Sequence, residues 1–144
     1  MKTLIIIKPS AVERGIIGEI LSRFERQGIR ISALRIINMS KKQAEKLYAV
    51  HKGKQFYNKL IEHMTSYPVV VAVLDVDFPN PDDAIKLVRK IIGVTNPLEA
   101  DMGTIRGDFG LRIDRNIIHA SDSVESAEYE IPIFFSKEEF VTYD

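Results

Sequence analysis

The sequence predicts an α/β (α+β) fold, a ferredoxin-like sandwich with helices packed on a four-stranded antiparallel sheet and one long inserted loop. Two observations predict it. Four short runs have the apolar or alternating pattern of strands, and stretches with helical spacing separate them in the order β-α-β-α-α-β-α-β. The 144 residues contain no repeat or linker, so we expect a single domain over residues 1–144.

Four segments are predicted strands. Leu4–Ile7 is continuously apolar, and Val69–Leu74 is a second buried run that is rich in β-branched residues. Ile29–Met39 alternates but slips phase near its middle, which indicates a β-bulge. Asn116–His119 is a short strand that ends on a histidine.

Three helices are predicted in the first half of the chain. Gly15 and Gly28 enclose a stretch with apolar residues at helical spacing. Ser40, followed by Gln43 three residues later, matches a capping box and opens a second helix. A shorter helix around Leu60 then leads to the second buried strand.

The second half contains two predicted helices with an irregular stretch between them. Pro81 lies in the first turn of one helix and Gly93 ends it. Val94–Asp114 shows little periodicity, so it is either a functional loop or a place where an element is missed. Asp122 and Ser123 are predicted to cap the last helix, which we expect to end before Pro132.

Composition excludes several kinds of function. The absence of cysteine excludes disulfides, thiolate nucleophiles and cysteine-ligated zinc, and three scattered histidines argue against a histidine-rich metal site. Twenty basic and twenty acidic residues cancel, so we expect neither nucleic acid nor an anionic membrane as a partner. The apolar run near the N-terminus is too short for a signal peptide or a membrane span, and we therefore expect a cytoplasmic protein.

The segment Asn116–Ser123 is the clearest candidate for chemistry. It sets His119 among small polar or acidic side chains, including Ser121 and Asp122. A side chain that titrates near neutrality beside oxygen groups can move a proton or carry a chemical group. The alternative is a partly buried histidine at a strand end beside a helix cap, and these eight residues alone do not decide between the two.

Four cationic or hydroxyl side chains lie in or beside irregular segments: Lys8, Arg89, Thr95 and Arg106. Guanidinium groups suit phosphate oxygens because their planar fork donates two hydrogen bonds at once. Any one of these residues, taken singly, is better explained as a solvated surface group. No GxxxxGK[ST] loop is present, so a nucleotide site here would not be of the Walker type.

Together, these segments resemble the nucleoside diphosphate kinase family. The resemblance runs from about residue 3 to about residue 135 and is carried, in order, by Lys8-Pro9-x-Ala-Val, Arg14-Gly, Thr95-Asn-Pro, Gly103-Thr-Ile-Arg-Gly-Asp-Phe109 and Asn116–Glu128. In that family the histidine takes the γ-phosphoryl group of a nucleoside triphosphate and passes it to a nucleoside diphosphate. The resemblance therefore implies ping-pong phosphoryl transfer with broad base and sugar tolerance, and a role in balancing nucleotide pools.

The resemblance also assigns roles to individual residues. His119 is the implied phosphoryl acceptor, and Glu130 and Ser121 are the residues expected to hold its imidazole. The implied phosphate and ribose contacts are Lys8, Tyr48, Arg89, Thr95, Arg106 and Asn116. The residues implied to flank the base are Phe56, Leu60 and Ile113.

The family also implies a cofactor and an assembly. Asp122 is expected to help place a Mg²⁺ ion that is held chiefly by the substrate's own phosphates. The implied ligands are nucleoside di- and triphosphates, and the implied assembly is a homo-oligomer, either a tetramer or a hexamer.

The chain departs from the family's pattern at four places. Ser10 stands where the family usually has aspartate, and Tyr67 and Ala120 stand where it usually has glycine. The segment Leu74–Asp83 is a few residues longer than usual and precedes the helix that bears Arg89. These changes motivate a second hypothesis, a catalytically weak nucleotide-binding or regulatory protein that uses the same pocket. A single-stranded nucleic-acid module is a third, although the zero net charge gives it little support.

Overall fold

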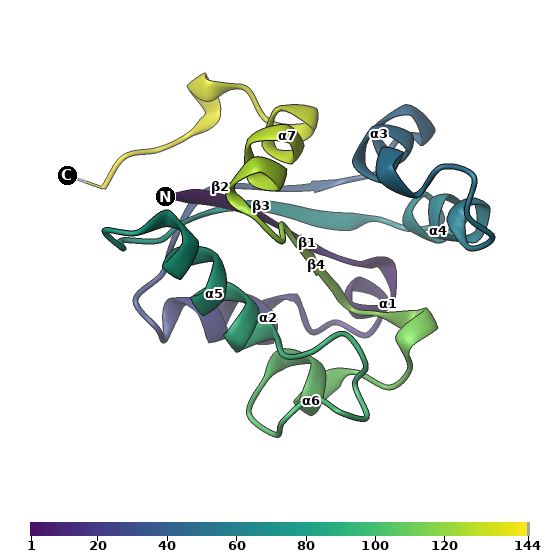
Figure 1. Cartoon of the computed structure of the whole chain (residues 1–144), viewed down its shortest axis with the longest axis horizontal. Helices are drawn as coiled ribbons and strands as arrows, with labels where there is room; N and C mark the ends of the chain where they lie inside the picture. The colour runs from purple at the N-terminus through teal and green to yellow at the C-terminus, as the bar shows by residue number, and fades with distance from the viewer. Residues whose placement is uncertain (144) are drawn as a thin grey trace.

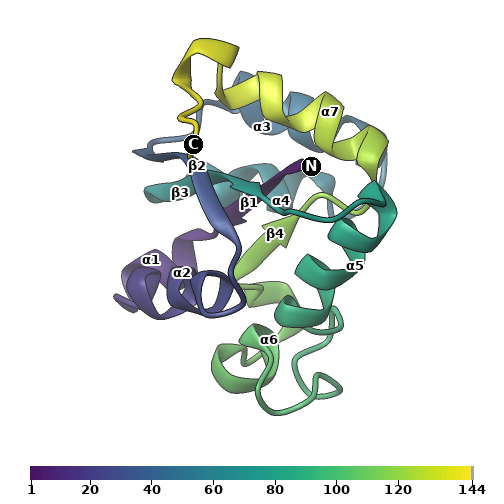
Figure 2. The same ribbon diagram turned by 90° about the vertical axis from the view of Figure 1, so that its left-hand side faces the viewer.

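The computed structural model describes residues 1–143 as an antiparallel sheet between two helical layers, as Figure 1 and Figure 2 show. The four strands are β1 (Lys2–Ile7), β2 (Arg30–Ile37), β3 (Val69–Asp75) and β4 (Ile118–Ala120). One face carries α1 (Pro9–Glu13), α2 (Ile17–Glu25) and α5 (Pro81–Ile92). The other face carries α3 (Lys41–Leu47), α4 (Tyr57–Met64) and α7 (Val124–Phe134). The shorter helical turns are η1 (Ala49–His51), α6 (Ile105–Phe109), η2 (Ile113–Arg115) and η3 (Lys137–Glu139).

The sheet has the order β2-β3-β1-β4, and every neighbouring pair is antiparallel. The two continuously apolar runs, β1 and β3, occupy its centre because helices cover both of their faces. Side chains of β1 alternate between the two cores, with Ile5 and Ile7 on one side and Leu4 and Ile6 on the other. The predicted four-stranded antiparallel sheet is confirmed.

The predicted bulge in the second strand is also confirmed. The register of β2 against β3 shifts between Ile31 and Ala33, which leaves Ser32 as the extra residue. The backbone N–H of Val141 donates to the Ser32 carbonyl at 2.9 Å, so the C-terminal segment covers the edge strand at this point.

Several helix ends follow the predicted sequence features. The Ser40 and Gln43 side chains form both hydrogen bonds of the capping box of α3. Pro81 lies in the first turn of α5, and Gly93 follows that helix with φ of +92°, a conformation that favours glycine. A side chain at residue 93 would also clash with the Thr104 hydroxyl, so both the backbone conformation and the lack of space favour glycine at this position.

Two short helices were not predicted. α1 begins directly after the first strand, and α6 lies within the stretch Val94–Asp114 that lacked periodicity, capped by the Thr104 hydroxyl. Each has only five residues, which is too short for a 3.6-residue repeat to become visible in a sequence. The irregular stretch was therefore in part a missed element.

Two predicted boundaries were wrong. The last strand is β4, Ile118–Ala120, rather than Asn116–His119, because the pairing partners in β1 are Ile5 to Ile7. Pro132 does not follow the last helix but lies inside α7. Proline removes only one N–H donor there, and the final turn is kept by burial of Phe134 and by the Phe135 N–H, which donates to Ile131.

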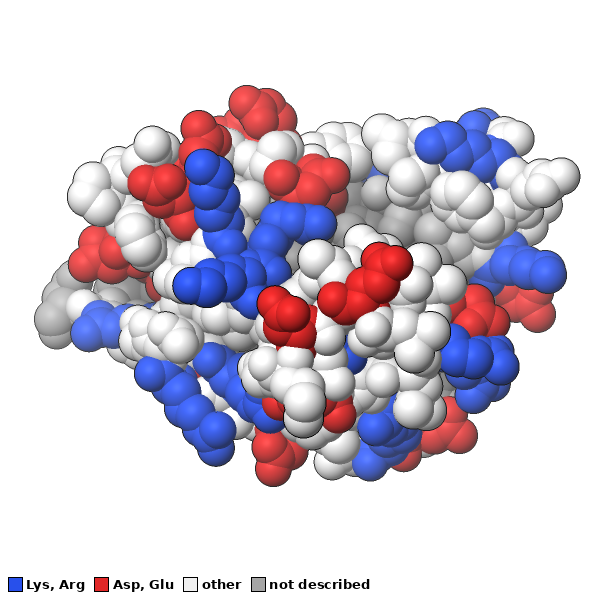
Figure 3. Space-filling view, turned by 60° about the horizontal axis from the view of Figure 1, so that its bottom comes forward, with Lys and Arg blue, Asp and Glu red and all other residues white. Residues whose placement is uncertain are grey.

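The surface carries charges of both signs. Figure 3 shows basic and acidic side chains interspersed over the face that bears α5 and α6, in keeping with a net charge of zero. Among residues 1–143, no helix combines the length and the apolar character that crossing a membrane requires.

Candidate active site

A cavity of about 560 Å³ opens where the first turns of α7 face the end of α3, and most of the predicted site residues line it. The strand end of β4 forms its floor. The predicted residues on its wall are Lys8, Tyr48, Leu60, Arg89, Thr95, Arg106, Asn116, His119, Asp122 and Glu130. Side chains from widely separated parts of the chain therefore meet in one recess.

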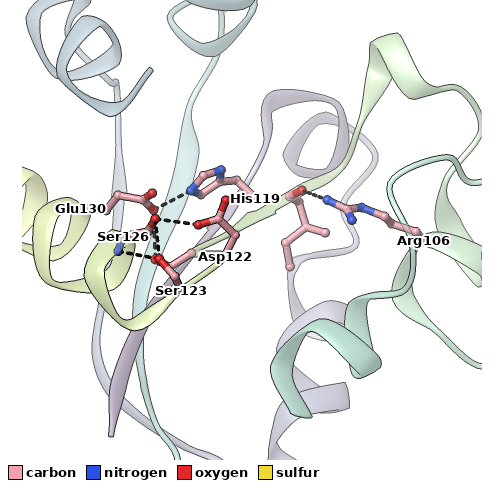
Figure 4. A network of polar contacts seen from close by, with 8 residues as sticks. Arg106, His119, Asp122, Ser123, Ser126 and Glu130 are labelled. Carbon is pink, nitrogen blue, oxygen red and sulfur yellow. Dashed lines mark hydrogen bonds and ion pairs between the residues drawn. The ribbon is translucent and has the colours of Figure 1, made fainter. Parts of the chain in front are cut away.

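The two ring nitrogens of His119 have different environments. The Nε2 group hydrogen-bonds to Glu130 Oε1 at 2.8 Å, and the Ser121 hydroxyl donates to the same oxygen at 3.0 Å (Figure 4). Because a carboxylate accepts hydrogen bonds, Nε2 carries the proton in the neutral imidazole and Nδ1 keeps its lone pair. Sequence spacing alone does not predict this contact; it forms because α7 starts soon after β4 and packs back over the sheet.

Tyr48 packs against the histidine. Its ring meets the His119 ring edge-on at a centroid distance of 5.9 Å, and its hydroxyl is buried without a hydrogen-bond partner among the described residues. Burial, and secondarily the charge of Glu130, raises the pKa of Tyr48. The hydroxyl therefore stays protonated and can donate a hydrogen bond to a ligand that enters the cavity.

Arg106 connects the long loop to the floor of the cavity. It donates to Asn116 Oδ1 at 3.3 Å, to the Gly93 carbonyl at 3.0 Å and to the Ile118 carbonyl at 3.0 Å. A guanidinium has five N–H donors, so two remain for a ligand. Burial and the neighbouring charge of Arg89 lower the pKa of Arg106 to about 10, which leaves it cationic at neutral pH.

Lys8 is a second buried cation at this site. It follows β1 directly and is held in place because Pro9 begins α1 and the Lys8 N–H donates to the Ile117 carbonyl. Burial and repulsion from Arg106 lower the pKa of Lys8 to about 8. Two nearby cations that are both destabilised by burial form a site that favours an anion.

Asp122 is fixed by a chain of hydroxyl groups at the start of α7. The Ser123 hydroxyl donates to Ser126 Oγ at 3.0 Å, and the Ser126 hydroxyl donates to Asp122 Oδ1 at 2.6 Å (Figure 4). The hydrogen bond from Ser126 is the largest influence that lowers the pKa of Asp122, with Arg89 adding to it. The carboxylate is thus ionised and retains one oxygen, Oδ2, for other partners.

A phosphate-sized anion would therefore meet fixed cations, a free imidazole nitrogen and one carboxylate in the same recess. The family model for nucleoside diphosphate kinase matches residues 1–140. The chain belongs to the nucleoside diphosphate kinase family.

Known members of this family are similar along almost the whole chain. A nucleoside diphosphate kinase of Thermosipho africanus is 53% identical over 142 residues, which cover 99% of this chain and 93% of that protein. One of Saccharolobus solfataricus is 48% identical over 136 residues, which cover 94% of this chain and 95% of that protein.

Solved structures agree with the fold. The enzyme of Aquifex aeolicus has a TM-score of 0.90 at 45% identity and covers 97% of this chain and 98% of its own. A nucleoside diphosphate kinase of Halobacterium salinarum in complex with CDP has a TM-score of 0.92 at 35% identity, with coverage of 100% and 93%. The ferredoxin-like arrangement expected from the sequence is thereby confirmed.

The departures from the nucleoside diphosphate kinase pattern fall at the rim of the site or behind it. Ala120 contributes to the cavity lining next to His119, and its side chain belongs to the apolar core that contains Ile5 and Ile118. Ser10 donates to the Asn116 carbonyl at 3.3 Å, and Tyr67 lies half-exposed outside the cavity. Arg89 lines the cavity in spite of the lengthened segment that precedes α5.

Three predicted residues of the family site do not line the cavity. Ser121 is buried behind Glu130. Phe56 and Ile113, the expected base contacts, are exposed at its margins, and the Phe56 ring packs on the ring of His51 with centroids 5.2 Å apart. Both are therefore available to a base that protrudes from the cavity.

Sequence reasoning missed other side chains on the wall. His51, Glu125 and Tyr129 line the cavity, although the sequence did not single them out as site residues. Glu125 and Tyr129 are four residues apart and so share a flank of α7 next to the face that bears Ser126 and Glu130. This four-residue spacing was the one feature of the sequence that could have indicated that Glu125 and Tyr129 lie beside the site.

Proposed function

We propose that the nucleoside diphosphate kinase activity of this chain proceeds in two half-reactions through a phosphohistidine at His119. The observation that carries the proposal is the hydrogen bond of Nε2 to Glu130, which leaves Nδ1 unprotonated in a cavity lined with cations. Neutral imidazole is a competent nucleophile near pH 7.

In the first half-reaction, the Nδ1 lone pair forms a bond to the γ-phosphorus of a nucleoside triphosphate. The bond between that phosphorus and the β–γ bridging oxygen breaks, and its electron pair leaves with the nucleoside diphosphate. The imidazole gains positive charge as the new bond forms, and the Glu130 carboxylate offsets this charge through Nε2–H. The second half-reaction is the reverse, with a terminal phosphate oxygen of another nucleoside diphosphate as the acceptor.

Fixed donors around the cavity stabilise the transferring group. The transition state of phosphoryl transfer is loose and spreads charge over three equatorial oxygens, so pre-positioned cations supply most of the stabilisation. Lys8, Arg89 and Arg106 provide the positive charges in this proposal. Tyr48, Thr95 and Asn116 provide neutral hydrogen-bonding groups.

We also propose Mg²⁺ as the cofactor. Within residues 1–143, no cluster of three or more histidine, aspartate or glutamate side chains could hold a metal ion by itself. Asp122, a cavity-lining carboxylate with one unshared oxygen, fits an ion that keeps its waters and is bound mainly by phosphate oxygens. When bound, Mg²⁺ neutralises charge on those oxygens and orients them.

The base is expected to be held by its faces. Leu60 lines the cavity, Phe56 packs on the ring of His51 in its wall, and Ile113 is an exposed apolar side chain close in sequence to Asn116. Stacking of this kind tolerates every base because each has a π-face. The related Halobacterium salinarum structure contains CDP, which supports a nucleotide ligand, and broad tolerance fits a role in balancing nucleotide pools.

A phosphoenzyme assay tests the mechanism. Incubation with γ-labelled ATP and no acceptor should leave acid-labile, base-stable label on the protein, and His119→Asn should abolish it. Chasing with CDP or GDP should remove the label at similar rates. Tight diphosphate binding without label would favour the alternative of a catalytically weak nucleotide-binding protein.

We further propose a homo-oligomer, a tetramer or a hexamer. β2 is an edge strand, and its side chains Leu34 and Ile36 are exposed. Leu98 and Met102 are exposed in the long loop as well. Unpaired edge strands and apolar side chains of this kind are typical of surfaces that associate.

A further inference from the structure

The helices α3 and α4 and the turn between them form a helical hairpin, residues 40–66, beside the cavity. One hydrogen bond links this hairpin to α7, the helix that carries Glu130. The Tyr129 hydroxyl on α7 donates to the Lys46 carbonyl in the last turn of α3, at 2.7 Å. The Tyr129 side chain lines the cavity and is 52% exposed. Carbonyl groups in the last turn of a helix lack their usual partners, so this acceptor is available for a side chain.

No other hydrogen bond or ion pair among residues 1–143 joins the segment 40–66 to the rest of the molecule. The segment is otherwise held by apolar packing, through Leu47, Ile61 and Met64 in the core shared with β1, β3 and α7. Apolar packing favours burial but has little directional preference. A single directional bond can therefore decide where the hairpin sits along α7, and Figure 2 shows α3 running beside α7.

The residues immediately after Lys46 are those that face the ligand. Leu47 to His51 line the cavity, and Tyr48 packs edge-on against His119. His51 then packs on Phe56, so a series of rings runs from the nucleophile to the mouth of the cavity. A shift of the hairpin would move all of these rings relative to His119.

We propose that Tyr129 is a positioning residue that fixes the nucleoside-binding wall of the cavity through the Lys46 carbonyl. The inference rests on the proposed function, in which this wall receives the base and sugar while the opposite floor receives the phosphates. The tether acts on the hairpin and touches neither Nδ1 of His119 nor the buried cations. Because the hairpin also carries Tyr48, loss of the tether should affect nucleotides more than a phosphoryl donor that has no base.

The test uses Tyr129→Phe, which removes only the hydroxyl group, in the full-length protein. Tyr143→Phe is the matched control, because the Tyr143 hydroxyl also donates to a backbone carbonyl, that of Ile31, and its side chain is 49% exposed. Three assays are used: calorimetry for the ADP affinity, steady-state kinetics for kcat and KM with ATP, and labelling for the rate of His119 phosphorylation by phosphoramidate. Hydrogen exchange of the amides in residues 40–66 reports the hairpin directly.

A single hydrogen bond typically contributes enough to change a binding constant roughly two- to tenfold. Tyr129→Phe should weaken ADP binding and raise the KM for ATP by that factor, with smaller changes in kcat and in phosphoramidate reactivity and with faster exchange in residues 40–66. Tyr143→Phe should change none of these. Equal behaviour of the two variants, or an equal loss with phosphoramidate and ATP, would overturn the proposal. Failure of the unsubstituted protein to label would contradict the phosphohistidine mechanism instead, and the ADP affinities would still decide the role of Tyr129.

Discussion

At the residue scale, the arrangement around His119 depends on one carboxylate that is buried against it. Glu130 accepts hydrogen bonds from the imidazole and from Ser121 through the same oxygen, so its position is fixed from two sides. The segment around His119 was sufficient to single out this histidine as a candidate for chemistry, and the family resemblance made it the expected nucleophile. The partner Glu130 came only from the family resemblance, because two turns of helix separate it from the strand end.

Glu130→Gln keeps the size of the side chain and removes its charge. We expect phosphorylation of His119 by ATP to slow by about 10²-fold, because the charge that develops on the imidazole is no longer offset. Glu128→Gln, an exposed position of the same helix, is the control and should leave the rate unchanged. Rapid-quench labelling measures both, and a rate within twofold of the original for Glu130→Gln would contradict the role assigned to this carboxylate.

The low pKa of Lys8 predicts a pH dependence. Because that pKa is about 8, the ammonium group is mostly charged at pH 7 and loses its charge as the pH rises through 8. ADP affinity should therefore fall between pH 7 and pH 9, with proton uptake on binding near pH 8. Calorimetry in buffers of different ionisation enthalpy measures both effects. Lys8→Met should bind weakly throughout with a flatter profile, and a constant affinity of the original protein across this range would refute the assignment.

At the element scale, the long loop matters because α6 carries Arg106 into the site. Longer elements were predicted from their periodicity and end residues, as with α3 and its capping box at Ser40. The five-residue helices α1 and α6 were not predicted, because little more than one helical turn is too short for a hydrophobic repeat to be detected. The position of Tyr129 opposite Lys46 was equally beyond reach, because it depends on how α7 and α3 pack.

Two glycine substitutions test how α6 is held. A methyl group on Gly107 would lie 2.0 Å from the Asp101 carbonyl oxygen, whereas one on Gly18 in α2 would meet nothing within 4 Å. Gly107→Ala should lower the free energy of unfolding by about 1–3 kcal/mol and reduce ATP reactivity by displacing Arg106. Gly18→Ala should raise the free energy of unfolding by about 0.4–1 kcal/mol. Urea denaturation measures both, and equal effects would show that α6 is not packed closely against residue 101.

At the scale of the whole molecule, the edge strand β2 is covered by the C-terminal segment near Ser32 and carries exposed apolar side chains at Leu34 and Ile36. The order of strands follows from burial, because the two continuously apolar runs require cover on both faces and the alternating one does not. That much was predictable from β1 and β3. The surfaces through which copies of the chain would associate could not be predicted. Exposed side chains such as Ile36 become informative only once β2 is placed at the edge of the sheet.

A charge on that edge tests the proposed assembly. Ile36 is 66% exposed on β2, so Ile36→Glu should leave the folded chain intact and hinder edge-to-edge association. Sedimentation should show a tetramer or hexamer for the original protein and smaller species for the variant at equal concentration. An unchanged size distribution would place the interface elsewhere, for example at Leu98 and Met102 in the long loop.

The position of the phosphoryl group on the ring tests the account most directly. The protein labelled with ¹⁵N-histidine is phosphorylated by ATP without an acceptor, and nuclear magnetic resonance then identifies the nitrogen bonded to phosphorus. The hydrogen bond from Nε2 to Glu130 predicts phosphorus on Nδ1 of His119. Phosphorus on Nε2, or on a histidine other than His119, would contradict the account.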